Sequence, residues 1–192
     1  MEFAEVLQKR RMARSFDDRP VEPAVAERIV AAGLRAPSAG FTQGVELVVL
    51  DGPAETARYW DAALPAPARE GFPWPGLLRA PLLVVVVSSE AAYRRRYAEA
   101  DKAGAAFDVP WWHVDAAFAA LLLQLAATDA GLGSLFFRAH RPDAVRVVLG
   151  IPASFVAVGT VAVGHAEPDR PSSSVRGRAR RPAADVVHRG GW

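Results

Sequence analysis

The longest helical pattern in the sequence, Trp111 to Ala130, is apolar on nearly every side. A helix of this composition has no face suited to water, so it lies in the centre of a fold or in a subunit interface. Hydrophobic residues make up 51% of the 192 residues, which is enough for the core of one domain. We therefore predict a single domain, residues 1–192, arranged around this helix.

Shorter patterns surround the central helix. Phe3, Val6 and Leu7 recur at helical spacing, which predicts a helix over residues 2–12 whose apolar stripe faces inward. The sequence predicts further helices at 23–33, 53–62 and 142–149, and strands at 45–50, 82–87, 135–137 and 155–163. The proline-rich stretch 64–75 cannot form regular ladders and is expected to be a surface loop. Strands separated by helices predict an α+β fold.

The last segment, residues 166–192, is polar, rich in arginine and closed by Trp192. Together with the apolar central helix, it suggests a homodimer in which this arm reaches across to the other subunit. The alternative is a frayed chain end. An aromatic residue at the very end favours the arm over the frayed end.

Composition excludes several classes of chemistry. The chain has no cysteine, which excludes disulfides, thiolate metal sites and cysteine nucleophiles, so any redox activity needs a cofactor. The net charge is +2, from 23 basic and 21 acidic residues. The protein therefore has no strong overall positive potential that would favour binding to nucleic acid. The first residues lack the layout of a signal peptide, and no apolar run has the length and purity of a membrane span. We expect a soluble cytoplasmic protein.

Three arginines, Arg10, Arg11 and Arg14, crowd the end of the first predicted helix. Guanidinium groups suit a phosphate, although basic residues also favour the C-terminal end of a helix for its dipole alone. Self-contained catalytic signatures are missing from the sequence: it has no Walker loop, no dinucleotide-binding glycine fingerprint and no nucleophile elbow. The four histidines are isolated and fit no metal spacing, so we expect no metal site.

Four segments occur in a telling order: the arginines before Phe16, the run Pro37-Ser38-Ala39-Gly40-Phe41-Thr42-Gln43, the turn Gly131-Leu132-Gly133-Ser134, and the basic run 176–181 before Pro182. In this order they resemble the nitroreductase family of flavin enzymes, over nearly the whole chain. The resemblance implies a central mixed sheet flanked by helices, a homodimer, FMN at the subunit interface and NAD(P)H as electron donor. It implies an oxidoreductase that passes hydride through the flavin to a small acceptor such as a nitroaromatic or quinone.

The resemblance also assigns residues. Arginines from both ends of the chain would hold the phosphate and ribityl of FMN, the run 37–43 would line the ribityl and the ring, and the backbone near Arg138 and Ala139 would face the reactive edge of the flavin. The positions matched in this way are Arg10, Arg11, Met12, Arg14, Pro37, Ser38, Ala39, Gln43, Gly133, Arg138, Ala139, Arg178 and Arg180. No acid–base pair is implied, because the flavin carries the chemistry.

The sequence departs from the family pattern at three places. Met12 stands where the family has a serine, Phe41 where it has an asparagine, and Gly44-Val45 where Pro-Trp is common. These departures leave a second function open, a flavin-binding or storage protein with little turnover. A nucleic-acid binder using Arg94 to Arg96 and the arginine tail is disfavoured, because one short basic cluster is a small electrostatic footprint. The choice between NADH and NADPH, and whether residues 90–110 form a lid, stay open.

Overall fold

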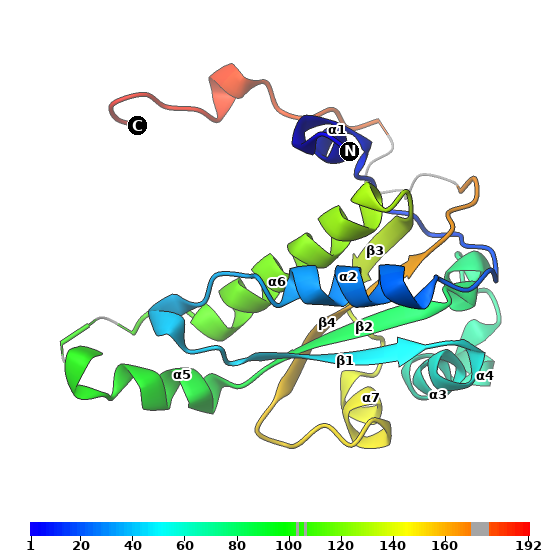
Figure 1. The fold of residues 1–192 in the computed structure, drawn as a ribbon, viewed down its shortest axis with the longest axis horizontal. Coiled ribbons are helices and arrows are strands. Elements are labelled where there is room, and N and C mark those ends of the chain that lie inside the picture. Colours follow the sequence, from blue (N-terminus) through cyan, green and yellow to red (C-terminus); the bar gives the residue numbers. More distant parts are fainter. Residues whose placement is uncertain (103, 106, 170–176) are drawn as a thin grey trace.

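The computed structural model describes residues 1–102, 104–105, 107–169 and 177–192. Its centre is a four-stranded sheet with the order β1-β2-β4-β3 (Figure 1). The strands are β1 (Val45–Asp51), β2 (Leu82–Ser88), β3 (Gly133–Phe137) and β4 (Val156–Gly164). The helices are α1 (Phe3–Lys9), α2 (Pro23–Gly33), α3 (Pro53–Ala63), α4 (Ala66–Arg69), α5 (Glu90–Tyr97), α6 (Trp111–Asp129) and α7 (Pro142–Val148). The predicted α+β class is confirmed.

The prediction of a mixed sheet is wrong, because every pair of neighbouring strands is antiparallel. β2 is apolar from Leu82 to Val87 and buried on both faces, a pattern that is common in parallel strands. Here the same burial arises because helices cover both faces of an antiparallel sheet. In the described residues, the only parallel pairing is an isolated bridge between Met12 and Ser134.

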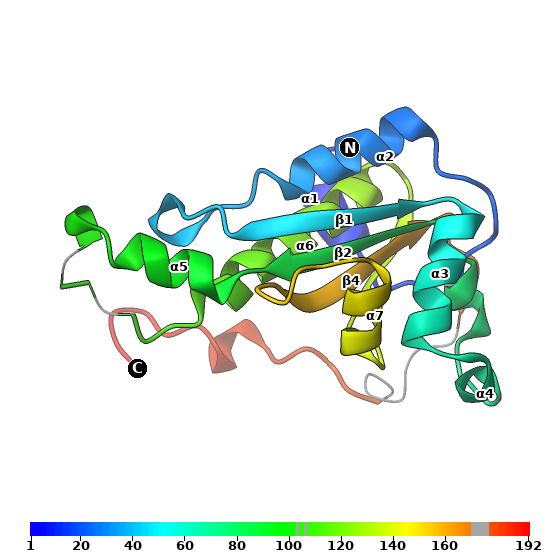
Figure 2. The same cartoon turned by 90° about the horizontal axis from the view of Figure 1, so that it is seen from below.

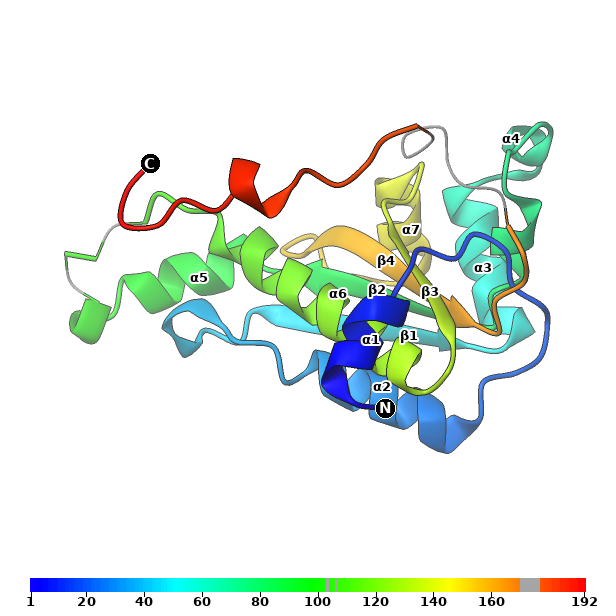
Figure 3. The same ribbon diagram turned by 90° about the horizontal axis from the view of Figure 1, so that it is seen from above.

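Alternate residues of β2 divide the core into two layers. Leu82, Val84 and Val86 pack against α2 and α6, whereas Leu83, Val85 and Val87 pack against α3 and α7. Figure 2 shows α3 and α7 in front of the sheet, and Figure 3 shows α6 with α1 and α2 in front of it. The sheet is therefore the middle layer of three, which explains why its central strand carries no polar face.

The first helix is shorter and less buried than predicted. It ends at Lys9 instead of residue 12, and Val6 is its only buried side chain. Phe3 and Leu7, expected to face inward, are 67% and 52% exposed. The helix packs across the end of α6, where the amino group of Met1 donates to the Asp129 carboxylate at 2.6 Å. Because α1 contacts α6 over one turn only, Val6 is the only residue of the predicted apolar stripe that is buried.

The central helix is buried on one side only. Ala116, Ala119, Ala120, Leu123 and Ala127 face the sheet, but Phe118 and Leu121 are 42% and 45% exposed. With exposed Ala117 and the half-buried Val114, Leu122 and Leu125, they form a continuous stripe on the opposite side, which we call the outer stripe of α6. The helix therefore has a second apolar face that no described residue of its own chain covers fully.

The proline-rich stretch is partly helical, since α4 lies inside it, and its aromatic residues Phe72 and Trp74 are packed against the core. Residues 177–192 of the arm are exposed throughout and lie away from the body in Figure 1. None of the described helices is long and apolar enough to cross a bilayer.

Candidate functional site

The predicted site residues fall into two groups at opposite ends of α6. Residues 10–14, here called the arginine segment, lie near its C-terminal end, and residues 37–43, here called the loop, lie near its N-terminal end (Figure 1). Two contacts fix these positions: Asp115 accepts from the Ala39 amide, and Asp129 accepts from the chain's amino group. Fourteen residues of helix separate the two carboxyl groups, about 21 Å at 1.5 Å per residue.

The arginine segment is extended chain that runs beside the start of β3. The Ala13 amide donates to the Ser134 carbonyl at 2.9 Å, and Met12 forms the parallel bridge to the same residue. This pairing aligns Arg10, Arg11 and Arg14 along one edge of the protein. Neither Arg10 nor Arg11 forms a salt bridge with any residue that the structure describes. Their charges are therefore available to an anion such as a phosphate.

Arg14 is held from two sides. Its Nη1 donates to the Met12 carbonyl at 3.3 Å, and its guanidinium lies over the Trp74 ring, 5.7 Å from the centroid. A cation placed over an indole face in this way is stabilised by the ring quadrupole. The proline-rich stretch thus supplies a residue of the candidate site that the sequence analysis missed. The sequence held one signal of this role, namely that Trp74 is an aromatic residue in a proline-rich stretch.

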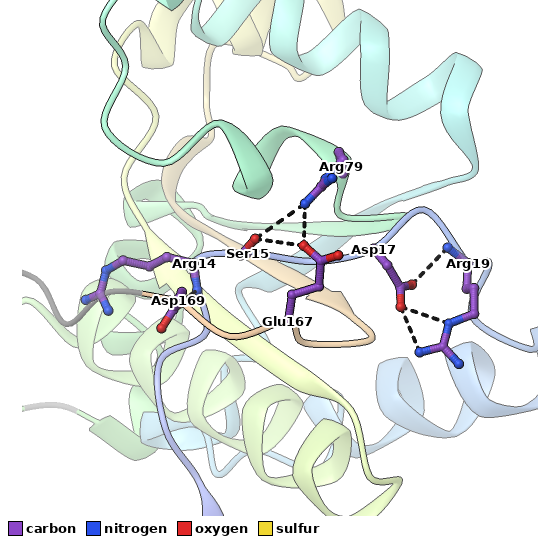
Figure 4. Close-up of polar contacts among 7 residues, drawn as sticks. All are labelled: Arg14, Ser15, Asp17, Arg19, Arg79, Glu167 and Asp169. Carbon is purple, nitrogen blue, oxygen red and sulfur yellow. Dashed lines mark hydrogen bonds and ion pairs between the residues drawn. The ribbon is translucent and has the colours of Figure 1, made fainter.

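Acidic residues after β4 bind the chain next to Arg14 (Figure 4). Glu167 accepts from the Ser15 hydroxyl at 3.1 Å and forms an ion pair with Arg79, while Asp169 accepts from the Arg14 backbone amide. The Arg14 side chain itself extends away from the ion pair of Glu167 and Arg79. The contacts fix the root of the arm beside the arginine segment, although no sequence pattern had joined these residues.

Asp17 and Arg19 form a local pair in the same stretch, with Arg19 Nη2 2.7 Å from Asp17 Oδ2 (Figure 4). The hydrogen bond from Arg19 lowers the pKa of the Asp17 carboxyl group below its usual value. Both side chains are surface groups, so the pair shapes the turn after the arginine segment and contributes little to stability.

Gly133 and Met12 are explained by packing within the chain. A Cβ atom on Gly133 would come within 2.6 Å of the Ala166 Cβ and 3.0 Å of the Ala13 Cβ, so only glycine fits between these segments. Gly133 also borders a hollow of about 530 Å³ that Lys9 and Arg11 line. Met12 packs against the core, and beside it the buried Ser134 hydroxyl has no hydrogen-bond partner among the described residues.

The end of β3 offers backbone donors where the resemblance places the flavin. Within the described chain, the Arg138 and Ala139 N–H groups donate to no backbone carbonyl. Buried N–H groups are normally paired, so the free N–H of the buried Ala139 at this strand end suits a ligand acceptor, and the N–H of the exposed Arg138 precedes it. Ala139 is buried at 6% exposure, and a cavity of about 160 Å³ lies between it, Trp60 and Phe72. Free cations and free N–H groups are a donor set that fits an anionic flavin cofactor.

The loop at the other end of α6 has an unusual backbone. Gly40, Phe41 and Gln43 all have positive φ, at 61°, 53° and 52°. Ser38 Oγ accepts from the Gln43 amide at 2.8 Å, which closes the loop on itself. The Phe41 side chain is 76% exposed, and Pro37 and Gln43 are exposed too. The loop therefore exposes the side chains of Pro37, Phe41 and Gln43 on the surface of the single chain.

Arg178 and Arg180 are exposed, and Arg176 lies outside the described residues. No hydrogen bond or salt bridge joins the two described arginines to the arginine segment within the described chain. One chain alone thus places the arginine segment beside Gly133 at the start of β3 and Arg138 and Ala139 after the end of that strand, and it leaves the loop at the far end of α6. Among the described residues, no cluster of three or more His, Cys, Asp or Glu residues could hold a metal.

Comparisons with known proteins show which family the chain belongs to. A model of the nitroreductase family matches residues 7–165. The chain is 25% identical over 195 residues to an NADH dehydrogenase/NAD(P)H nitroreductase of Archaeoglobus fulgidus, covering 100% of this chain and 99% of that protein.

Solved structures share the fold. A nitroreductase family protein from Clostridium difficile 630 superposes with a TM-score of 0.73 at 21% identity, with 100% of both chains covered. An FMN-dependent nitroreductase from Clostridium difficile R20291 superposes with a TM-score of 0.70 at 22% identity, covering 97% of this chain and 98% of the other.

Proposed function

The chain belongs to the nitroreductase family, and on that premise we propose that it is an FMN-dependent enzyme that oxidises NAD(P)H and reduces a small acceptor such as a nitroaromatic or quinone. The family membership makes it an NAD(P)H nitroreductase-like oxidoreductase. Nitroreductases are typically FMN-dependent, and one similar solved structure is described as such. The absence of cysteine and of a described metal cluster agrees with chemistry carried by an organic cofactor.

The observation that carries the proposal is the division of the candidate site between the two ends of α6. The loop is anchored at Asp115 and the chain's amino group at Asp129, about 21 Å away along α6, so a single chain keeps the loop and the arginine segment near opposite ends of this helix. A twofold homodimer solves this problem, because it places the loop of one chain beside the arginine segment of its partner. We therefore propose two composite sites per dimer.

The apolar surface supports this dimer. Phe118 and Leu121 of the outer stripe of α6, and Phe3 and Leu7 of the neighbouring α1, are large apolar side chains that a single chain leaves in water. Patches of this kind mark interaction surfaces. The arm, residues 166–192, would reach the partner from the root that Glu167 and Asp169 fix.

Within each site, the residues divide the work. Arg10, Arg11 and Arg14 would bind the phosphate and ribityl, joined by Arg178 and Arg180 from the arm; charge-assisted bonds of this type contribute about 1.5–3 kcal/mol each. Ser38 and Gln43 of the loop would contact the ribityl and ring. The Arg138 and Ala139 N–H groups would stabilise negative charge that develops at the flavin edge, by the logic of an oxyanion hole. Bound FMN supplies the acceptance and release of hydride.

A visible absorbance spectrum of the purified protein tests the proposal. We expect a yellow protein whose flavin bands bleach on addition of NADH or NADPH and return on addition of a nitroaromatic or quinone. A colourless protein that cannot be reconstituted with FMN would refute it.

A flavin-binding or storage protein is the second candidate, because the exposed Phe41 ring stands in the loop that would meet the flavin. That function predicts bound flavin without steady NAD(P)H oxidation. Fast turnover with any of several acceptors would exclude it.

A further inference from the structure

The loop is strained and needs support from outside. Left-handed backbone costs about 1–2 kcal/mol for a residue with a side chain, and both Phe41 and Gln43 adopt it. Local contacts alone, such as Ser38 Oγ with the Gln43 amide, do not attach the loop to the body. Two longer contacts do so. Asp115 Oδ2 accepts from the Ala39 amide at 2.8 Å, and Arg96 Nε donates to the Gly40 carbonyl at 2.8 Å.

Asp115 is the deeper of the two anchors. It lies on α6 at 2% exposure, and the same oxygen that accepts from Ala39 also accepts from the Tyr93 hydroxyl at 2.7 Å. No cation among the described residues forms a salt bridge with it. Burying a carboxyl group costs free energy unless hydrogen-bond donors satisfy it. Asp115 accepts from one donor of the loop and one donor of α5, so it connects these two segments.

Tyr93 also explains a departure from the family pattern. Its ring fills the space beside Gly44, where a Cβ atom would come within 2.5 Å of Tyr93 Cε2. The common proline at this position would collide with the ring. Burial, followed by the hydrogen bond to Asp115, raises the pKa of the Tyr93 hydroxyl, so it remains a donor above the pH at which a free tyrosine ionises. Gly44 and Tyr93 thus form a matched pair at the end of the loop.

We propose that Asp115 and Tyr93 are positioning residues for the loop: they fix the backbone from Ser38 to Gly44 in the strained shape that presents Ser38 and Gln43 to the flavin. The inference rests on the proposed function, since it assigns these residues a role in holding FMN. Neither residue touches the cofactor itself. Their effect reaches it through the Ala39 amide and the Gly44 backbone.

The test is FMN affinity, measured by quenching of flavin fluorescence on titration into the apoprotein. We expect Tyr93→Phe to weaken binding about fivefold and Asp115→Ala by at least tenfold, in line with the loss of one or two buried hydrogen bonds. Asp115→Asn keeps an oxygen for the Ala39 amide and should restore most of the affinity. In the Asp115→Ala background, adding Tyr93→Phe should change affinity less than twofold, because the two act through one contact.

Tyr59→Phe is the matched control. Tyr59 is equally buried, and its hydroxyl hydrogen-bonds Thr160 at 2.8 Å in the core layer on the other face of the sheet. The control should lower the melting temperature about as much as Tyr93→Phe does and leave FMN affinity unchanged. Hydrogen exchange of the peptide 37–44 should rise in the Asp115 and Tyr93 variants and not in the control.

The outcomes separate the two proposals. A wild-type protein that binds no FMN overturns the proposed function and this role with it. A wild-type protein that binds FMN, with Asp115→Ala and Tyr93→Phe binding equally well, overturns the positioning role alone. Equal loss of affinity in Tyr59→Phe would show a general stability effect and overturn it as well.

Discussion

Arg14 connects the parts of the arginine segment at the scale of single residues. Its backbone amide binds Asp169 at the root of the arm, and its guanidinium lies over Trp74. The side chain is half-buried and preorganised, so little entropy is lost when an anion binds it. This placement makes Arg14 the most informative arginine to remove.

Arg14→Ala should weaken FMN binding about ten- to a hundredfold, because one charge-assisted contact worth about 1.5–3 kcal/mol is lost. Bound FMN per chain after gel filtration measures the effect. Arg28→Ala, which removes an exposed arginine of α2, is the charge-matched control and should retain wild-type FMN content. Full FMN content in Arg14→Ala would show that other residues hold the phosphate.

The two buried tyrosines make stability sensitive to alkaline pH. Burial is the main cause of the raised pKa of Tyr59 and of Tyr93, so both stay protonated in the folded protein while free tyrosines ionise from about pH 10. The unfolded state then binds fewer protons than the folded state. Stability is therefore complete below pH 10 and falls above it, by about 1.4 kcal/mol per pH unit for each tyrosine.

Urea unfolding between pH 8.5 and 11 measures this dependence. The double variant Tyr59→Phe/Tyr93→Phe should show a shallower decline than the wild type, despite its lower stability at pH 8.5. Parallel declines in the two proteins would mean that other groups govern alkaline unfolding.

At the scale of elements, α6 shows why an apolar helix can be predicted and its surroundings cannot. The apolar pattern of residues 111–130 predicted a helix that needs burial on nearly all sides, and the helix forms over Trp111–Asp129. Only one half of its circumference packs on the sheet, however, and the outer stripe with Phe118 and Leu121 is left exposed in the single chain. The dimer that we propose would bury this second face in the subunit interface.

Phe118→Glu/Leu121→Glu should therefore convert a dimer into monomers, because two charges would be buried in an apolar contact. Light scattering after gel filtration gives the mass, and FMN content should fall together with it. The control is Val147→Glu, which changes a 68% exposed apolar residue of α7 on the other face of the sheet. A dimer that survives the α6 change would place the interface elsewhere.

At the scale of the whole molecule, the separation of the arginine segment and the loop makes a prediction that no single variant can test. If each site takes its arginines from one chain and its loop from the other, two inactive variants should complement each other. A chain with Arg10→Ala/Arg14→Ala and a chain with Ser38→Ala/Gln43→Ala would each lack one half of every site.

Mixed and refolded together, they should form heterodimers in which one site has both intact halves. Bound FMN and NAD(P)H oxidation should then return in the mixture and stay absent from either variant alone. A mixture as inactive as its components, with heterodimers demonstrated by differential tagging, would show that each site lies within one chain.

Local patterns in the sequence sufficed for α2, α3, α6, α7 and the four strands, for the α+β class and for the arginines as candidate anion ligands, because periodicity, proline and charge act over a few residues, but they did not predict the short α4. The first helix was overestimated, since burial of Phe3 and Leu7 depends on a neighbour that the sequence does not reveal. The mixed sheet that the resemblance implied was also wrong, and the sequence could not correct it, because apolar residues in β2 indicate burial on two faces and not the direction of the next strand.

Tertiary structure decided the rest. It placed the Arg14 guanidinium over the Trp74 ring, joined Glu167 to Ser15 and Arg79, and anchored the loop to Asp115. All of these are contacts between segments that are far apart in the chain. It also set the two groups of predicted site residues at opposite ends of one helix. The sequence by itself could name candidate ligands of a phosphate, since charge is a property of residue type, and the candidate flavin contacts came from the family resemblance. How far apart these candidates lie is a property of packing, and that separation is the reason why we propose a second chain.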